Sequence, residues 1–460
     1  MRILRTCGTL VAVCFAVMMT EAANRVARFE NGMGFVADVE KALKSGADYD
    51  AFVFRVKSGD DKDEFSRAVE QIRQARPATS VIAVYPREDA AWRAIIDRLI
   101  IAPYCDGPEK ENAYVDYIVS VNWGVDRKHP KYLALSERAN RRTQRLHDSK
   151  WGVFNHFLGH GCRTAEEWNA KVNGFDVKAL GERLSACGAR FYFITIMQGR
   201  RWMLAPNATY DRICGTKPGE ACAKRDLVLE LSEELERRGI DLYLYYTGDG
   251  PYLDPELGPK MGLVSPRIGG VDRRFVENWA AVLEEYAVRY GKRVKGWWVD
   301  GCYEELLKYN DDLLDVYTAA IRKGSGEAIV AYNNGVREYF TAYGRSADFT
   351  AGEFNDFYAV PKGRFVNGQQ AFALIPLGDW TQGGDGAGWC SPGMKISSEK
   401  LVNYVRTVNE RGGVVAIDVR INPDSSWDAD QFEALKALKP ISAKASPSMP
   451  GACSDHGGKR

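Results

Sequence analysis

Two carboxylates stand at the ends of predicted strands. The run Val294–Gly301 is apolar and aromatic until it reaches Asp300, and the glycine that follows lets the chain turn away. A second β-rich run, Asp348–Glu353, also ends in an acid. In a parallel α/β barrel the C-terminal ends of the strands form the active-site mouth. A pair of carboxyl groups at that mouth is the smallest set of catalytic residues that hydrolyses a glycosidic bond.

The positions of these acids depend on a repeating pattern over residues 146–440. Short β-rich runs alternate with polar loops and amphipathic helical stretches such as Asp226–Arg238, which is closed by Gly239. Eight such runs predict an α/β fold of the (β/α)8 TIM-like barrel type, and an open doubly wound sheet is the alternative. The runs are Trp151–Leu158, Ala189–Met197, Ile240–Thr247, Val294–Asp300, Ala328–Asn334, Asp348–Glu353, Ala371–Leu377 and Gly413–Arg420.

Residues 24–145 precede the barrel and predict a small α/β domain. Asp50–Val56, Thr79–Tyr85 and Tyr114–Asn122 have the composition of strands, and Asp63–Arg76 has the pattern of a helix. At the other end, residues 441–460 are rich in Ser, Lys, Pro and Gly and predict a disordered tail.

Charge and composition narrow the class of partner. The 460-residue chain carries 62 Lys and Arg against 61 Asp and Glu, which argues against nucleic acid or an anionic membrane as the main partner. Its 11 Trp and 22 Tyr suit a protein that stacks aromatic faces against sugar rings, although ordinary core packing explains many of them.

Residues 1–22 have the pattern of a secretory signal peptide. Arg2 and Arg5 form a basic start, and the apolar stretch Gly8–Met19 is too short to span a bilayer. Thr20 and Ala22 place small residues at the expected cleavage site. No later stretch reaches transmembrane length, so we expect a secreted or periplasmic protein without a membrane span.

Cysteine and histidine usage points away from a metal mechanism. Of the 10 cysteines, Cys7 and Cys14 lie in the predicted signal peptide, and the others show no CxxC or Cys/His spacing typical of a zinc site. We therefore predict neither a metal nor an organic cofactor. Cys214 and Cys222 flank a Gly/Pro/Lys loop and are the best disulfide candidates in an oxidising compartment.

Five segments, in order along the chain, resemble the α-L-fucosidases of glycoside hydrolase family 29. The opening strand has their Gly-x-Phe-x-His pattern, and the strand ending in Asp300 is the most specific match. The segments are Trp151–His156, Arg237–Tyr246, Trp297–Gly301, Asp348–Glu353 and Gly412–Asp424. The resemblance implies Asp300 as the nucleophile and Glu353 as the acid/base.

The resemblance, together with residues at the predicted strand ends and loops, indicates a set of sugar-binding residues. His156 corresponds to a ligand of sugar hydroxyls, whereas a lone histidine is more often a buried core residue. Trp380 and Trp389 lie in a Gly-rich loop and are candidates for a stacking wall or for packing that loop. The complete set predicted to bind substrate is His156, Gln198, Arg200, Trp202, Tyr246, Trp298, Trp380 and Trp389, with Asn333 and Asn334 as weaker candidates.

One departure from the family concerns sugar selection. The second strand of these fucosidases usually ends in Lys-His-His-Asp-Gly-Phe, but this chain has Met197–Trp202 there. Gln198 can still donate and accept hydrogen bonds, whereas Gly199 has no side chain. The substrate can therefore differ from fucose, and the Arg200–Arg201 pair could bind an anionic group such as sulfate or remain solvated.

A looser resemblance concerns residues 29–146. Asn31–Gly34, Ser58–Asp61 and Asp126–Pro130 follow the order of the later blocks in SGNH-type esterases, where Asp-x-x-His supplies the base for a serine. The serine segment has no counterpart, so His129 has no nucleophile to activate. The resemblance implies a degenerate esterase-like domain.

These observations predict an exported retaining glycosidase, α-L-fucosidase-like, that cleaves a terminal fucose or related sugar from an oligosaccharide or glycoconjugate. One alternative is a non-catalytic carbohydrate-binding relative, because the paired histidines are missing. Another is a carbohydrate esterase that works through the N-terminal domain. If Asp300 and Glu353 lie far apart, Asp379 or Asp385 is the alternative acid.

Overall fold

A computed structural model describes residues 26–29, 34–47, 49, 51–57, 59–75, 80–84, 100–102, 141–263, 269–337, 339–382 and 387–443. The chain divides into two units, Met1–Ser120 and Val121–Arg460. The predicted signal peptide, the strand expected at Tyr114–Asn122 and residues 444–460 of the predicted tail lie outside the described residues. No helix in the described ranges is long and apolar enough to cross a membrane.

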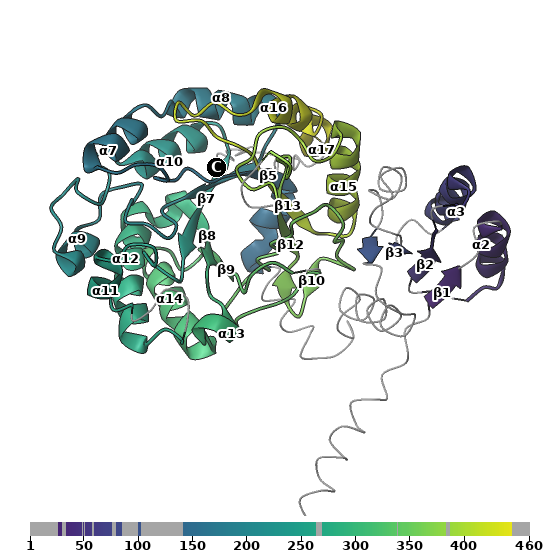
Figure 1. The fold of residues 1–460 in the computed structure, drawn as a ribbon, viewed down its shortest axis with the longest axis horizontal. Helices are drawn as coiled ribbons and strands as arrows, with labels where there is room; N and C mark the ends of the chain where they lie inside the picture. Colours follow the sequence, from purple (N-terminus) through teal and green to yellow (C-terminus); the bar gives the residue numbers. More distant parts are fainter. Residues whose placement is uncertain are drawn as a thin grey trace, which may run out of the picture. The chain divides into compact units, whose positions relative to one another are not determined.

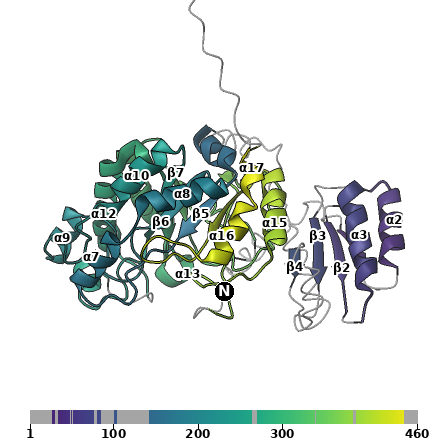
Figure 2. The same ribbon diagram turned by 90° about the horizontal axis from the view of Figure 1, so that it is seen from above.

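The described part of the N-terminal unit is a parallel sheet with two helices. The strands pair in chain order, and both helices lie on the same face of the sheet (Figure 2). The elements are β1 (Val26–Phe29), α2 (Phe35–Lys44), β2 (Ala51–Arg55), α3 (Lys62–Ala75), β3 (Ser80–Val84) and β4 (Ile100–Ala102). β2, α3 and β3 coincide with the predicted strands and helix. Most of the esterase-like segments, including Asp126–Pro130, lie outside the described residues.

The C-terminal unit is built around a curled, seven-stranded parallel sheet (Figure 1). Its strands are β5 (Trp151–Asn155), β6 (Phe191–Thr195), β7 (Asp241–Thr247), β8 (Val294–Asp300), β9 (Ile329–Tyr332), β12 (Phe372–Pro376) and β13 (Val414–Asp418). Their order in the sheet is β12-β13-β5-β6-β7-β8-β9, so the last strand pairs with the first. A parallel sheet that curls and returns to its first strand is TIM-like.

Helices surround this sheet (Figure 1). Capping side chains start several of them, because Asp176, Asp226 and Asp272 each accept the backbone N–H three residues further on. The helices are α7 (Ala165–Asn173), α8 (Val177–Cys187), α9 (Ala208–Cys214), α10 (Leu227–Arg237), α11 (Leu257–Met261), α12 (Arg273–Tyr290), α13 (Glu304–Leu307), α14 (Asp311–Gly324), α15 (Ser398–Glu410), α16 (Ala429–Lys436) and α17 (Lys439–Ala443). A short hairpin, β10 (Phe365–Val366) with β11 (Gln369–Gln370), precedes β12.

The prediction of eight regular strands is wrong at one position. Residues 348–354, which we call the seam, lie between the edge strands β9 and β12 and form only isolated bridges. Backbone bonds nevertheless reach both edges: the Asp348 N–H donates to the Val330 carbonyl at 2.8 Å, and the Leu374 N–H donates to the Gly352 carbonyl at 2.8 Å. The seam therefore closes the barrel without being a regular strand.

Side chains of the seam replace part of the missing backbone ladder. The Asp348 carboxylate accepts the Val330 N–H at 3.1 Å, and the Thr350 hydroxyl accepts the Phe372 N–H at 3.0 Å. The same hydroxyl donates to the Phe372 carbonyl at 2.8 Å. Gly352 then leaves the extended conformation with φ 57°. A prediction from the pattern of residue types cannot show that side-chain hydrogen bonds replace backbone hydrogen bonds at this segment.

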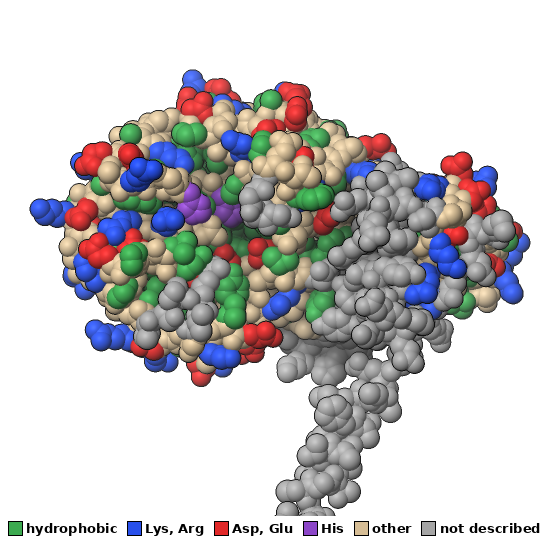
Figure 3. Space-filling model, viewed as in Figure 1, with side chains coloured by type: hydrophobic (Ala, Val, Ile, Leu, Met, Phe, Trp, Pro, Cys, Tyr) green, Lys and Arg blue, Asp and Glu red, His purple; other side chains and the backbone are tan. Residues whose placement is uncertain are grey.

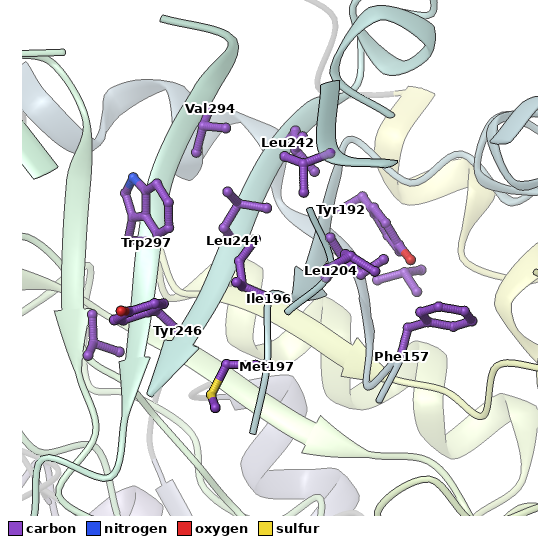
Figure 4. Packing of buried hydrophobic residues seen from close by; sticks show 14 of the residues in the cluster. Phe157, Tyr192, Ile196, Met197, Leu204, Leu242, Leu244, Tyr246, Val294 and Trp297 are labelled. Carbon is purple, nitrogen blue, oxygen red and sulfur yellow. The ribbon is translucent and has the colours of Figure 1, made fainter. Parts of the chain in front are cut away.

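Alternation along the strands sorts the buried residues into two layers. Residues that face the barrel interior include Phe154, Phe193, Tyr243, Tyr245, Trp298, Ala331, Ala351, Phe372 and Ala416. Residues of the opposite parity pack between the sheet and the helices, and they include Tyr192, Leu244, Tyr246 and Trp297 (Figure 4).

A helix formed by residues 141–149 closes the N-terminal end of the barrel. Leu146 is fully buried within the interior layer. The Arg142 guanidinium donates to the Asp348 carboxylate at 2.7 Å and to the Ala328 carbonyl at 2.8 Å. Arg145 donates to both oxygens of Asp241, each at 2.5 Å. The domain boundary predicted at residue 145 therefore falls inside a helix that belongs with the barrel.

The predicted disulfide does not form in the structure. Cys214 and Cys222 are separate buried thiols. Burial raises the pKa of Cys214 to about 12 and the pKa of Cys222 well above its ordinary value. Both side chains belong to the hydrophobic layer outside the barrel, so they act there as small apolar groups.

Candidate active site

The C-terminal ends of the strands bring a group of polar side chains to one mouth. Each of them stands two residues after an interior residue, and the alternation of a strand therefore points it inward. They are His156, Asp300, Asn333, Glu353 and Asp418, which follow Phe154, Trp298, Ala331, Ala351 and Ala416. Histidine side chains gather in the hollow at the centre of this face (Figure 3).

Two donors hold the Asp300 carboxylate. The Tyr245 hydroxyl donates to Oδ2 at 2.5 Å, and the Asn333 amide donates to Oδ1 at 2.7 Å. Burial, together with the charges of Asp300 and Asp249, raises the pKa of Tyr245 well above its ordinary value. The hydroxyl therefore keeps its proton, and both partners act as donors to the carboxyl oxygens of a side chain that is only 7% exposed.

The Asn333 amide also binds the second carboxylate. The same nitrogen, Nδ2, donates to Glu353 Oε2 at 2.6 Å. Asn333 is 1% exposed, and its own Oδ1 accepts the Gly335 N–H at 3.1 Å, which fixes the orientation of the amide. Asp300 Oδ1 and Glu353 Oε2 can thus be no further apart than the sum of the two bonds, about 5.3 Å.

Glu353 is placed by the end of the seam. Its backbone carbonyl accepts the Arg337 N–H at 3.1 Å, and the next N–H, that of Phe354, donates to the Leu374 carbonyl at 3.1 Å. Beside Glu353 and Asn333 lies a cavity of about 30 Å³, whose lining includes Arg337 and Tyr339. A cavity of this size holds roughly one water molecule next to the carboxylate.

His156, Asp418 and Cys390 form a second polar cluster at the same mouth. His156 Nδ1 contacts Asp418 Oδ1 at 2.8 Å, and the Cys390 N–H donates to Asp418 Oδ2 at 3.2 Å. Burial alone would lower the pKa of His156, but the charges and hydrogen bonds of Asp418 and Cys390 raise it well above its ordinary value. These three residues are the group in the described ranges that could hold a metal ion.

The structure distributes the predicted tryptophans over three environments. Trp298 is 2% exposed inside the barrel, where it stacks on Tyr245 with ring centroids 5.4 Å apart. Trp389 lies edge-on to His156 at 5.7 Å, so it borders the mouth. Trp380 is 44% exposed. Trp389 thus lies next to the polar group, whereas Trp298 supports that group from below.

The segment that follows β6 holds the other predicted ligands. Gln198 is half-buried and Arg200 is exposed, whereas Arg201 is already paired with Asp254 at 2.6 Å. Trp202 is 8% exposed and packs so tightly against Gly159 that a Cβ there would come within 2.4 Å of it. Of the two arginines considered for an anionic group, only Arg200 retains an exposed head group.

The prediction for Tyr246 requires correction. Its side chain points to the helical layer, where it is fully buried and its hydroxyl donates to the Trp279 carbonyl at 2.9 Å (Figure 4). The neighbouring Tyr245 has the inward parity. In the pairing of β7 with β8, Tyr245 lies beside Trp298 and Thr247 lies beside Asp300. Because Trp298 and Asp300 face the barrel interior, the tyrosine paired with Trp298 faces it too, and this pairing was not used in the prediction.

Asp379, the alternative catalytic acid, lies in a turn whose own residues bind its carboxylate. Both oxygens of Asp379 are occupied locally, by Thr381 at 2.8 Å and by Gln382 at 3.0 Å. These hydrogen bonds lower the pKa of Asp379. Asp385 lies outside the described residues. A third buried acid, Asp249, was not predicted, and it accepts a hydrogen bond from Thr247.

The barrel has the fold of known glycoside hydrolases, although the sequence matches neither a protein-family profile nor a curated protein. The endo-fucoidan hydrolase MfFcnA4 from glycoside hydrolase family 107 aligns with a TM-score of 0.52 at 13% identity, over 67% of this chain and 55% of that chain. MfFcnA9 from the same family aligns at 0.51 and 13% identity, over 67% and 65%. The chain thus spans between about half and two thirds of these proteins.

An α-L-fucosidase is also among the similar structures. AlfC from Lactobacillus casei aligns at 16% identity over 66% of this chain and 99% of that chain, with a TM-score of 0.47.

Proposed function

We propose that this protein is a retaining glycoside hydrolase that cleaves a terminal α-L-fucose or a related sugar. The observation that carries the proposal is the Asn333 amide, which donates to Asp300 and to Glu353 at once. The oxygens it joins are at most about 5.3 Å apart, an upper limit compatible with the roughly 5–5.5 Å between the carboxyl groups of retaining enzymes. An inverting enzyme needs about 6.5–9.5 Å, because a water molecule must fit between the sugar and its base.

In the first step Asp300 attacks the anomeric carbon while Glu353 gives its proton to the leaving oxygen. The products of this step are an ester between the sugar and Asp300 and a free aglycone alcohol. In the second step Glu353 takes a proton from water, the water oxygen bonds to the anomeric carbon, and Asp300 leaves as a carboxylate. Tyr245 and Asn333 keep Asp300 in its attacking position throughout.

The substrate class is supported by the motifs and by the fold. The two endo-fucoidan hydrolases act, by their names, on fucoidan. The strand ending in Asp300 resembles the nucleophile strand of α-L-fucosidases. His156 faces the mouth as a fucosidase sugar ligand would, whereas Gln198 and Gly199 stand where the family has its histidine pair. We therefore propose a fucose-related sugar rather than fucose alone.

Turnover of an aryl α-L-fucoside tests the assignment of the nucleophile. Asp300→Gly should abolish turnover, and added azide should restore it with inverted configuration at the anomeric carbon. Asp379→Asn is the matched control, because this acid is held in its own turn, and it should keep wild-type activity. Wild-type rates from Asp300→Gly would refute the assignment, and binding without turnover by the wild type would favour a sugar-binding protein.

The anomeric form of the first product tests retention separately. Proton NMR of the wild-type reaction should show α-fucose before mutarotation, and Glu353→Ala with azide should give the α-azide. A β-configured first product would overturn the double-displacement mechanism.

Export through residues 1–22 belongs to the same proposal. Its test is a fusion of residues 1–30 to a reporter enzyme, which should be found outside the cytoplasm and lack the leader. A reporter retained in the cytoplasm would contradict export.

A further inference from the structure

We propose that His156, Asp418 and Cys390 form a site for a divalent transition-metal ion, with Zn²⁺ as the best match. An imidazole nitrogen, a carboxylate oxygen and a thiol sulfur from these residues all lie within 4.8 Å of one another. Zinc binds this mixture of nitrogen, oxygen and sulfur donors, whereas Mg²⁺ and Ca²⁺ prefer oxygen alone. With an ionised thiol and carboxylate, the cluster neutralises the double charge of the ion.

The ends of two adjacent strands and the loop after a third supply the ligands. β5 and β13 are hydrogen-bonded neighbours, and Asp418 pairs with Phe154, two residues before His156. β12 lies on the other side of β13, and the loop that follows it carries Cys390. Ligands that stand on neighbouring strands hold their separation better than ligands on independent loops.

The Cys390 loop is fixed on both sides of the thiol. Before it, Gly388 and Gly378 approach so closely that a Cβ on Gly378 would lie 2.4 Å from the Gly388 carbonyl. After it, the carbonyl of the buried Ser391 accepts a hydrogen bond from Gln431 at 2.8 Å. Cys390 itself has φ 57°, an uncommon conformation for a side-chain-bearing residue. The loop thus presents an exposed thiol at a defined place.

Small adjustments bring the three atoms to zinc geometry. His156 Nδ1 and Asp418 Oδ1 are 2.8 Å apart, whereas two such ligands of a tetrahedral zinc stand roughly 3.3 Å apart. The pair must therefore open by about 0.5 Å as the ion replaces the proton between them. Cys390 adapts by rotation about one bond, because its exposed side chain is not locked by packing. Three protein ligands leave the fourth position for water, as in open zinc sites.

The ion would lie beside the proposed nucleophile. The His156 ring contacts Tyr245 edge-on at 5.8 Å, and the Tyr245 hydroxyl binds Asp300. The ion and its bound water would occupy the mouth beside His156, where the sugar is proposed to bind, so the metal should compete with substrate. This competition rests on the proposed glycosidase activity, whereas the metal site itself does not.

Cobalt absorption tests the site without any activity. Titration of the full chain with Co²⁺ should produce a near-ultraviolet thiolate charge-transfer band at one equivalent, which Zn²⁺ then removes. Cys390→Ser should abolish this band, and Asp418→Asn should weaken the affinity for Zn²⁺ by about 100-fold. Cys162→Ser is the matched control, because Cys162 is a partly exposed thiol outside the cluster, and it should keep the wild-type spectrum. Absence of the band from the wild type, or its persistence in Cys390→Ser, would overturn the proposal.

Two further readouts separate this proposal from the glycosidase assignment. Zn²⁺ should slow alkylation of Cys390 by iodoacetamide at least tenfold, with no effect on Cys162, as measured by peptide mass spectrometry. Equal labelling with and without Zn²⁺ would contradict the site. If aryl α-L-fucoside is hydrolysed, Zn²⁺ should raise KM and leave kcat unchanged in the wild type. A protein that binds Co²⁺ but hydrolyses nothing would refute the glycosidase assignment alone.

Discussion

Replacing Asn333 by alanine is the most direct test of the bridged carboxylates. Its amide makes two hydrogen bonds to acidic side chains, at 2.7 and 2.6 Å. A hydrogen bond to a charged group contributes roughly 1.5–3 kcal/mol, and loss of one transition-state donor typically raises the barrier by about 2.7–4 kcal/mol. Since about 1.4 kcal/mol corresponds to a factor of ten, we expect Asn333→Ala to lower kcat/KM by about 100- to 1000-fold.

The assay compares two aryl α-L-fucosides that differ in leaving-group pKa. Loss of the amide frees both acids, so the rate should fall for the good and the poor leaving group alike. Asn334→Ala is the matched control, because Asn334 instead accepts the Glu304 N–H at 2.9 Å at the start of α13. Thermal unfolding of both variants shows whether the barrel is intact. An Asn333→Ala variant that is folded and within threefold of wild type would refute the positioning role.

Asn333→Asp provides an opposite perturbation at the same position. A third carboxyl would then stand within hydrogen-bond distance of Asp300 and Glu353. Three carboxyl groups this close together cannot all be ionised, so the cluster should take up a proton at higher pH than in the wild type. The acidic limb of the kcat/KM profile should therefore move to higher pH. An unmoved limb in an active variant would show that the amide does not lie between the acids.

Three further results follow from contacts elsewhere in the barrel. Tyr245→Phe should lower kcat at least tenfold by removing a donor to the nucleophile, whereas Tyr246→Phe should cost only about 1 kcal/mol of stability and leave the rate unchanged, as steady-state kinetics and urea unfolding would show. Arg142→Ala should destabilise the barrel by roughly 3 kcal/mol in urea unfolding, because the buried Asp348 then keeps only the Arg322 guanidinium at 3.4 Å as a charged partner, beside the Val330 N–H. Burial lowers the pKa of His147 below 6.5, so stability should fall as the pH drops below about 6.5, and His147→Gln should flatten this slope of Tm against pH.

The sequence predicted the regular strands and the position of Asp300 because local patterns encode both. A strand buried on both faces is a continuous apolar run, and Val294–Asp300 forms such a strand over its full predicted length. Burial on both faces also prevented the sequence from showing which side chains of the adjacent strand face the barrel interior. In Asp241–Thr247 every residue is buried, so hydrophobicity alone could not show that Tyr245 faces inward and Tyr246 outward.

Other features depend on residues that are distant along the chain. His156 and Asp418 are 262 positions apart, so no spacing rule for metal ligands could pair them. The two carboxylates are joined by Asn333, which the sequence suggested only as a weak pocket residue. The seam was predicted as a strand because it is a short β-rich run that ends in an acid. Its side-chain bonds to β9 and β12 form only when those strands are already in place.

The seam also divides the proposed catalytic pair between elements of unequal local stability. Asp300 ends β8, which is hydrogen-bonded along its length to β7 and β9. Glu353 lies near the end of the seam, which has isolated bridges, a few backbone hydrogen bonds and side-chain bonds to its neighbours. Segments held by fewer backbone bonds open at lower free energy than the sheet they border. On warming, the seam should exchange its amide hydrogens before β8 does, so the proton donor would be lost while the nucleophile stays in place.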